Sequence, residues 1–82
     1  MSIYSAVTTP SGFRMVKWDD GLNIEAIYEM SQRRHLHCSC FQANKPTCRH
    51  REMIKLFQSK RAINSGRFYD YDRKRWLPPI KL

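Results

Sequence analysis

Three cysteines and one histidine lie within thirteen residues of this chain, as C-S-C at 38–40 and C-R-H at 48–50. Four sulfur and nitrogen ligands at such short spacing are typical of a tetrahedral Zn²⁺ site. A metal matters to a chain of 82 residues, because so small a domain often needs a metal, a disulfide or a partner to fold. The sequence therefore predicts one structural Zn²⁺, bound by Cys38, Cys40, Cys48 and His50.

The cysteine count and the hydropathy pattern indicate the compartment. Three cysteines cannot all pair in disulfides, and in a reducing compartment all three thiols stay free to bind metal. Residues 1–12 lack the basic start and apolar run of a signal peptide. No stretch reaches the about 20 apolar residues of a membrane span. We therefore expect a cytoplasmic protein without a membrane partner.

The formal net charge of +8 is unevenly distributed along the chain. Residues 1–30 carry two cations and four anions, whereas residues 31–82 carry thirteen cations and three anions, so the two parts sum to −2 and +10. The basic part also contains the cysteines. Such asymmetry favours an acidic partner, with nucleic acid the first candidate. The alternative is a basic surface that serves only solubility.

Patterns in the first part of the chain predict strands. Turn-forming residues at 8–12 favour a loosely ordered N-terminal lead-in over residues 1–12. A strand is expected over 13–18, and Asp19-Asp20-Gly21 favours a hairpin into a second strand over 22–30, where apolar residues alternate. A helix over 23–34 is the competing interpretation, and the strand is preferred because turn and alternation agree.

The second part of the chain predicts a helix and a final hairpin. A polar turn over 31–34, a short extended segment over 35–40 and a loop over 41–47 lead to Thr47 as helix N-cap. An apolar stripe predicts a helix from about 48 to 64, closed by Gly66. A hairpin over 67–77 follows, and residues 78–82 form a tail. The predicted core is Phe13, Met15, Leu22, Ile24, Tyr28, Leu36, Ile54, Phe57 and Trp76.

The fold class expected from these elements is α+β, with a small antiparallel sheet, one helix and a zinc knuckle in a single domain over 13–77. The order strand, strand, C-x-C, C-x-H and helix resembles the SWIM-type zinc finger over roughly 26–57. The resemblance implies a ββα layout, a structural zinc, and binding to nucleic acid or protein. Residues 46–51 and 68–76 also resemble small stand-alone SWIM proteins of tailed phages and prophages, which implies a factor acting in the host cytoplasm.

Two other histidines are alternative ligands. His35 or His37 could replace His50, but His37 adjoins Cys38 and would strain the chelate. His50 is therefore the preferred fourth ligand. Otherwise His35 and His37 are exposed, or hydrogen-bond to groups around the metal.

The first functional prediction is binding to DNA or RNA through a basic helix face and the last hairpin. Nothing in the sequence indicates a base-specific reader, so we expect low specificity and a steep salt dependence. Tyr69, Tyr71 and Trp76 could stack on bases, although Trp76, like Trp18, is more often a core residue in so small a chain. The predicted phosphate contacts are Arg33, Arg34, Arg49, Arg51, Lys55, Lys60, Arg73, Lys74 and Arg75.

The alternative function is a protein-binding module that inhibits or modulates a host enzyme through protein–protein contact. An enzyme is disfavoured, because four protein ligands would close the metal's coordination shell. Neither a phosphate-binding glycine loop nor a nucleophile arrangement points to a small-molecule substrate. Asp70 and Asp72 could form a paired carboxylate site, but surface ion pairs with neighbouring arginines are the preferred interpretation.

Overall fold

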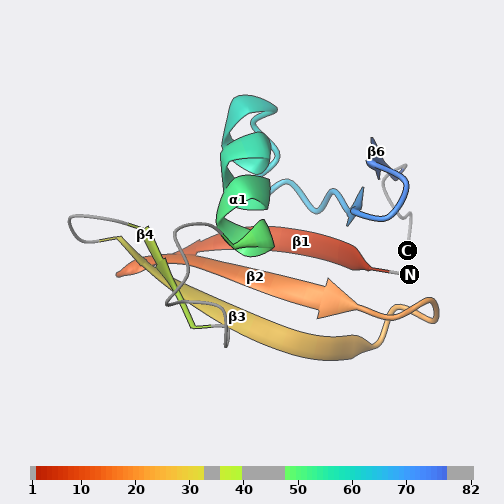
Figure 1. Ribbon diagram of the computed structural model, residues 1–82, viewed down its shortest axis with the longest axis horizontal. Coiled ribbons are helices and arrows are strands. Elements are labelled where there is room, and N and C mark those ends of the chain that lie inside the picture. The colour runs from red at the N-terminus through yellow and green to blue at the C-terminus, as the bar shows by residue number, and fades with distance from the viewer. Residues whose placement is uncertain (1, 33–35, 40–47, 78–82) are drawn as a thin grey trace.

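The structure is a computed structural model that describes residues 2–32, 36–39 and 48–77. In this part of the chain one helix lies on one face of an antiparallel sheet (Figure 1), so the predicted α+β class is confirmed. The strands follow the order β4-β3-β2-β1-β5-β6 across the sheet. The elements are β1 (Ile3–Thr9), β2 (Gly12–Trp18), β3 (Ile24–Gln32), β4 (Leu36–Cys38), α1 (Arg49–Ser59), β5 (Tyr69–Asp70) and β6 (Arg75–Trp76).

The β2–β3 hairpin forms where the Asp-Asp-Gly turn predicts it. The Asp19 carboxylate Oδ1 accepts hydrogen bonds from the backbone N–H groups of Gly21 and Asn23, both at 2.9 Å. This side-chain cap stabilises a tight turn. The strand interpretation of residues 22–30 is therefore confirmed over the helical one, and β3 continues to Gln32, into the segment expected to be a polar turn.

The expectation of a loose lead-in over residues 1–12 is wrong, because β1 is an interior strand of the sheet. It pairs with β2 from Ile3 opposite Trp18 to Thr9 opposite Gly12, and with β5 on its other side. Tyr4 and Ala6 point to the same face and are buried at 1% and 4% exposure. This apolar face is buried against α1, and the burial orders the strand. The turn-forming residues that favour a loose segment occupy only its end.

Helix α1 begins one residue after Cys48, which is the N-cap, so the prediction of Thr47 at this position is wrong. The helix ends at Ser59 rather than near residue 64. Arg61 adopts a left-handed φ of 52° and the N–H of Ala62 donates to the carbonyl of Phe57 at 2.8 Å. Backbone carbonyls at the helix end are thus satisfied by a local turn, and Gly66, with φ of 75°, lies in the turn that follows.

The core lies between α1 and the sheet. Met53, Ile54 and Phe57 of α1 are buried, which confirms the predicted apolar stripe. Met15 and Met30 are buried beneath them in the strands, at 0% and 1% exposure. Flexible methionine side chains fill the irregular space between a helix and a twisted sheet.

The predicted core residues fall into three groups. Met15, Ile54 and Phe57 are buried, and three partly buried aromatic residues pack against the core: Phe13, Tyr28 and Trp76. Leu22 and Ile24 are exposed at 37% and 57%, so the prediction is wrong there. Both lie at or next to the β2–β3 turn. Apolar and polar residues still alternate there in the sequence, but this end of the sheet is not covered. The side chain of Leu36 lies outside the described part.

The β5–β6 hairpin confirms the predicted final hairpin, with Tyr69 opposite Trp76. The Asp70 carboxylate Oδ1 accepts from the N–H groups of Asp72 at 3.1 Å and Arg73 at 3.2 Å. Lys74 follows with a left-handed φ of 56°. Because β5 pairs with β1, this hairpin is joined to the same sheet as the N-terminal strand.

Candidate metal centre and neighbouring basic residues

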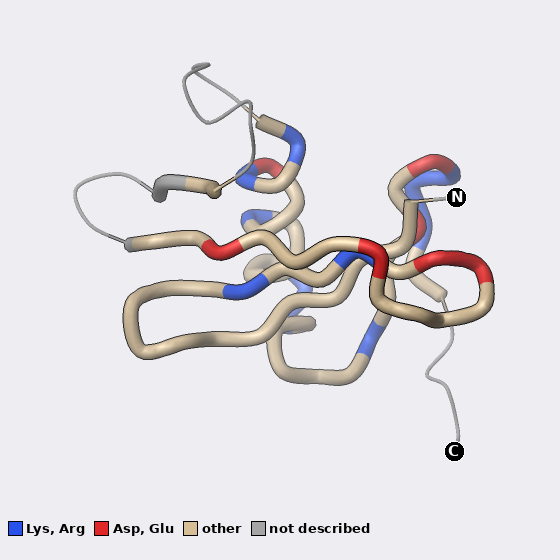
Figure 2. The backbone as a smooth tube through the Cα atoms, turned by 90° about the horizontal axis from the view of Figure 1, so that it is seen from below, with Lys and Arg blue, Asp and Glu red and all other residues tan. Residues whose placement is uncertain are grey.

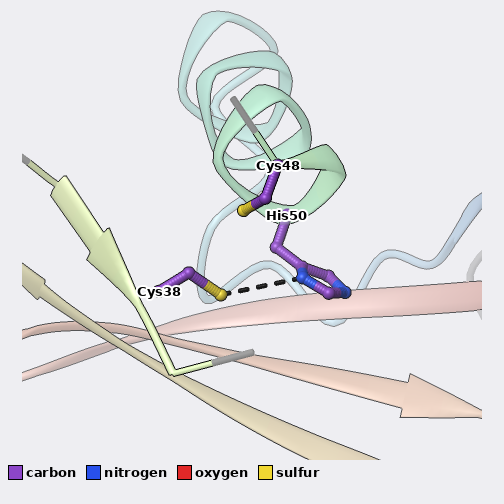
Figure 3. Close-up of side chains that lie close together, drawn as sticks. All are labelled: Cys38, Cys48 and His50. Carbon is purple, nitrogen blue, oxygen red and sulfur yellow. Dashed lines mark hydrogen bonds between the residues drawn. The ribbon is translucent and has the colours of Figure 1, made fainter. Parts of the chain in front are cut away.

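Three of the four predicted metal ligands meet between β4 and the start of α1. The ligand atoms of Cys38, Cys48 and His50 all lie within 4.8 Å of one another, and all three side chains are buried (Figure 3). Cys38 ends β4, Cys48 caps α1, and His50 belongs to the first helical turn. Cys40, the remaining predicted ligand, lies outside the described residues.

The pairing of β4 with β3 places Cys38 at the candidate metal centre. Cys38 is opposite Met30 in the β3–β4 pair, and both side chains are buried at 1% exposure. The following residue ties β4 to β3, because the Ser39 N–H donates to the Glu29 carbonyl at 2.9 Å and the Ser39 hydroxyl accepts from the Glu29 N–H at 3.0 Å. This double contact fixes the direction of the chain as it leaves β4.

The helix start brings the other two ligands to the same point. Cys48 has an extended backbone, with φ of −126° and ψ of 155°, and its side chain makes no cap hydrogen bond. Its sulfur instead lies with the other two ligand atoms. The N-terminus of a helix favours negative charge, so this is a suitable position for a thiolate.

The distance between two of the ligand atoms fits a shared metal ion. Cys38 Sγ lies 3.6 Å from His50 Nδ1 (Figure 3). Ligands bound to zinc at about 2.3 Å for sulfur and about 2.0–2.1 Å for nitrogen, at a tetrahedral angle, are about 3.6 Å apart. The group can therefore hold a metal ion without a large rearrangement, and His50 would bind through Nδ1.

The protonation of His50 also fits metal binding. The pKa of His50 is lowered from 6.5 to about 4, mainly by burial and in part by the positive charges of Arg49 and Lys17. The imidazole is consequently neutral at pH 7, which is the form that binds a metal.

Two tyrosines hold the His50 ring. Tyr28 stacks on it with ring centroids 3.9 Å apart and an angle of 25° between planes, and Tyr4 meets it edge to face at 5.8 Å. The sequence predicts Tyr28 as a core residue but misses Tyr4, although the apolar residues at 3, 4, 6 and 7 are the signal of a strand. Burial raises the pKa of Tyr4 above 10.0, so its hydroxyl stays protonated.

The alternative ligands are not tested by the structure. His35 lies outside the described residues, as do Arg33 and Arg34 of the predicted basic surface. His37 is in β4, but its side chain lies outside the described part. The choice of His50 over these two histidines is supported by the position of His50 beside both described cysteines.

The predicted helix cations do not share one face. Arg51 and Lys55 are four residues apart and lie on one side of α1, whereas Arg49 projects about 160° away from Arg51 by helical geometry. Lys60 is the C-cap and lies beyond the last helical residue. The expectation of a single basic face is therefore wrong, because the spacing of two residues between Arg49 and Arg51 separates them around the helix.

Arg49 instead faces the last hairpin. Its guanidinium carbon lies 5.0 Å from the centre of the Tyr71 ring, and the Lys74 ammonium lies 3.3 Å from the same point. Arg73 pairs with Asp70, with Nε and Oδ2 3.9 Å apart, and Arg75 is exposed in β6. Cations that are distant in the sequence thus gather around Tyr71.

The two aspartates of the hairpin have structural roles. Asp70 is 1% exposed and caps the hairpin turn through Oδ1. Its Oδ2 lies 3.9 Å from Nε of Arg73, so the expected ion pair with a neighbouring arginine is present, although the carboxylate is buried rather than on the surface. Asp72 is exposed, and its Oδ2 accepts from the Ser2 N–H at 2.6 Å.

The aromatic residues of the hairpin divide between core and surface. Tyr69 is buried and Trp76 packs edge to face on Phe57 at 4.9 Å, so the core interpretation of Trp76 is correct. Tyr71 is partly buried and packs edge to face on Tyr4 at 6.4 Å. Trp18 packs on Phe68 at 5.6 Å and donates to the Ser5 hydroxyl at 2.9 Å.

No described helix is long and apolar enough to cross a membrane. Comparison of the chain with protein-family models, with curated proteins and with solved structures finds no match in any of the three.

Proposed function

We propose that the chain is a small zinc-stabilised module that binds nucleic acid with low sequence specificity. The zinc part rests on two buried cysteine sulfurs and one buried imidazole nitrogen within 4.8 Å of one another. Thiolate and imidazole donors together favour Zn²⁺ over Mg²⁺ or Ca²⁺, which prefer oxygen. Cys40 would complete a closed shell of four ligands. Such a shell stabilises the fold and leaves no position for catalysis.

The arrangement of elements supports the resemblance to a SWIM-type zinc finger. In this proposal β3 and β4 supply the two strands, β4 carries the first ligand and α1 opens with the C-x-H pair. The chain adds β1 and the β5–β6 hairpin to that unit. A bound metal would join β4 to α1 across the core, and so would contribute directly to folding.

The observation that carries the nucleic-acid part is the gathering of exposed cations from α1 and the last hairpin, which come from separate parts of the sequence. Arg49, Lys74 and Arg75 are exposed there. Acidic residues of the β2–β3 turn, Asp19, Asp20 and Glu25, line one pocket. Acidic and basic residues lie beside one another near the N-terminus (Figure 2), so the proposal rests on the cations of α1 and the hairpin themselves. Exposed cations held together by the fold attract a polyanion.

The test combines zinc content with binding at several salt concentrations. Purified protein should contain one zinc per chain and bind single-stranded and duplex DNA and RNA at low salt. The observed affinity should fall steeply as salt rises, because bound phosphates release counterions. Affinity that is unchanged between low and moderate salt would argue against nucleic-acid binding. One bound zinc without any nucleic-acid binding would support the zinc site and contradict the nucleic-acid function.

A protein-binding module, of the kind that modulates a host enzyme in phage infection, is a second candidate. One observation favours it: Val7 and Ile27 are exposed at 38% and 51%, on the face of the sheet opposite the buried Ala6 and Tyr28 positions. Exposed apolar side chains on one sheet face are typical of protein contacts. Recovery of one stoichiometric partner after nuclease treatment would support this candidate, and absence of any partner would count against it.

A further inference from the structure

We propose that Arg49 and Lys74 form a pair that binds one backbone phosphate of a single-stranded nucleic acid beside the Tyr71 ring. The inference rests on the proposed nucleic-acid function and assigns it to two residues from different elements. Arg49 belongs to the first turn of α1 and Lys74 to the turn between β5 and β6.

The geometry places the two charges at a suitable separation. The Arg49 guanidinium carbon and the Lys74 ammonium lie 5.0 Å and 3.3 Å from the same ring centre, so they are no more than about 8 Å apart. In the proposed site one phosphate beside the ring bridges the two cations through charge-assisted hydrogen bonds of about 2.7–2.9 Å. It would also relieve the repulsion between the two cations.

Neither cation is neutralised by a carboxylate in the described part of the chain, unlike other cations of the predicted surface. Lys55 pairs with Glu52 at 3.6 Å and Arg73 with Asp70 at 3.9 Å, but no ion pair involves Arg49 or Lys74. Both cations lie over the Tyr71 ring. Cation–ring contacts position a cation and leave it able to bind an anion.

The backbone of Lys74 is a second, independent observation. Its φ of 56° lies in the left-handed region, which disfavours residues with a side chain other than asparagine or aspartate. Glycine would adopt this conformation without strain. Lys74 shares this conformation with Leu22, Arg61 and Asn64, but only here does the turn hold a cation over the Tyr71 ring.

Arg49 is held in place from two sides. It lies between Cys48 and His50, whose side chains are buried at the candidate metal centre, and its guanidinium carbon lies 5.0 Å from the centre of the Tyr71 ring. A cation that is already positioned loses less conformational entropy on binding. The site is therefore preorganised by the fold, in contrast to a lysine or arginine on an open surface.

A single strand fits this site better than a duplex. Tyr71 is only partly buried, and in the proposed site the phosphate draws the Lys74 ammonium away from the ring centre, so that an unpaired base can stack on the ring. The bases of a duplex are paired and present only their edges. Binding should consequently be stronger for a single strand than for a duplex of the same sequence.

The test uses the zinc-loaded protein and a labelled single-stranded oligothymidine, with Arg49→Gln and Lys74→Gly as variants. Each variant should weaken binding about fivefold at 0.1 M salt and lower the salt slope by about 0.7, as expected for one lost phosphate contact on a single strand. The double variant should lose little more than either single one, because both side chains contact the same phosphate.

Matched controls separate this site from general loss of charge. Arg61→Gly also removes one exposed cation from a left-handed position, with φ of 52°, but beyond the other end of α1. It should change binding less than twofold. Lys74→Gly relieves backbone strain, so weaker binding by this variant cannot be attributed to unfolding. If Arg49→Gln loses zinc, the Lys74→Gly result alone decides.

Each outcome has a defined meaning. Wild-type binding that is equally weakened by Arg61→Gly and Lys74→Gly would overturn the paired site, and so would Lys74→Gly binding with wild-type affinity. In both cases the proposed nucleic-acid function would stand, with contacts spread over other cations. If the wild-type protein binds no oligonucleotide at low salt, the proposed function itself fails.

Discussion

At the scale of single residues, the candidate metal centre consists of a few side chains that lie close together. His50 is 7% exposed and lies in the strongly basic part of the chain, residues 31–82. Its neutrality follows from burial and from neighbouring cations. The sequence predicts the three ligands that the structure brings together, because ligand type and spacing are local properties. It cannot predict that Tyr4 packs on the His50 ring, since that contact depends on the pairing of β1.

Replacement of Cys38 or Cys48 by serine should remove the bound metal and destabilise the protein by roughly 4 kcal/mol or more, which is the range for loss of a structural metal. Both sulfurs are buried, so a serine would also place a polar hydroxyl group in the core. Zinc content and thermal unfolding measure the effect. Ser11→Ala, at an exposed position in the β1–β2 turn, is the control, and a cysteine variant with wild-type thermal stability would contradict the prediction.

Acid should destabilise the protein through His50. Its pKa is about 4 in the folded chain and about 6.5 when unfolded, so the unfolded state binds more protons between these values and stability falls as pH decreases from 6.5 to 4. The full shift corresponds to roughly 3 kcal/mol. Competition between protons and the metal acts in the same direction.

Urea unfolding at pH 7, 5.5 and 4.5 measures this dependence. His37→Gln, which removes another histidine of β4, should retain it. A free energy of unfolding that is constant over the three pH values would show that His50 is not buried and neutral.

At the scale of elements, β1 shows where local patterns fail. Its apolar residues are few, and the turn residues that follow dominate the sequence signal, so residues 1–12 are expected to be loose. In the structure β1 gains order from two neighbours, β2 and β5. Strand β5 is distant from β1 in the sequence, so no local sequence pattern predicts this pairing. By contrast, the β2–β3 hairpin and the apolar stripe of α1 are local, and both are predicted correctly.

The two faces of β1 should respond differently to truncation. Tyr4→Ala removes a side chain that is 1% exposed and contacts the His50 ring, and should cost about 3–5 kcal/mol. Val7→Ala, at 38% exposure, should cost less than about 1 kcal/mol. Chemical denaturation of both variants tests the placement of β1. Equal small effects would indicate that residues 3–9 do not form an interior strand.

At the scale of the whole molecule, one core is shared between α1 and the sheet. The α1 residues Met53, Ile54 and Phe57 belong to the same buried cluster as Met15 and Met30 of the strands. A metal between β4 and α1 would close this core at one end, and Trp76 packs on Phe57 from the hairpin. The sequence predicts the α+β class correctly, but the position of the β5–β6 hairpin beside β1 depends on tertiary packing.

Removal of the metal with a chelator should therefore unfold the chain as one unit. The helical circular-dichroism signal of α1 and the fluorescence of the tryptophans, Trp18 on the sheet and Trp76 in the hairpin, should change together, as they do in a two-state transition. Re-addition of zinc should restore both signals. Loss of the helical signal with unchanged tryptophan fluorescence would show instead that the sheet folds without the metal.

The position of β1 also bears on how the chain acquires its fold during synthesis. Ile3 and Tyr4 pair with Asp70 and Tyr69, and the Tyr71 N–H donates to the Ser2 carbonyl at 2.9 Å. The ribosome makes β1 first and its second neighbour last. The nascent chain can form the β1–β2–β3 meander, but one edge of β1 stays open until residues 69–71 have left the exit tunnel. The pairing of β1 with β5 therefore forms later than the meander, and chaperones that protect open strand edges would act in that interval.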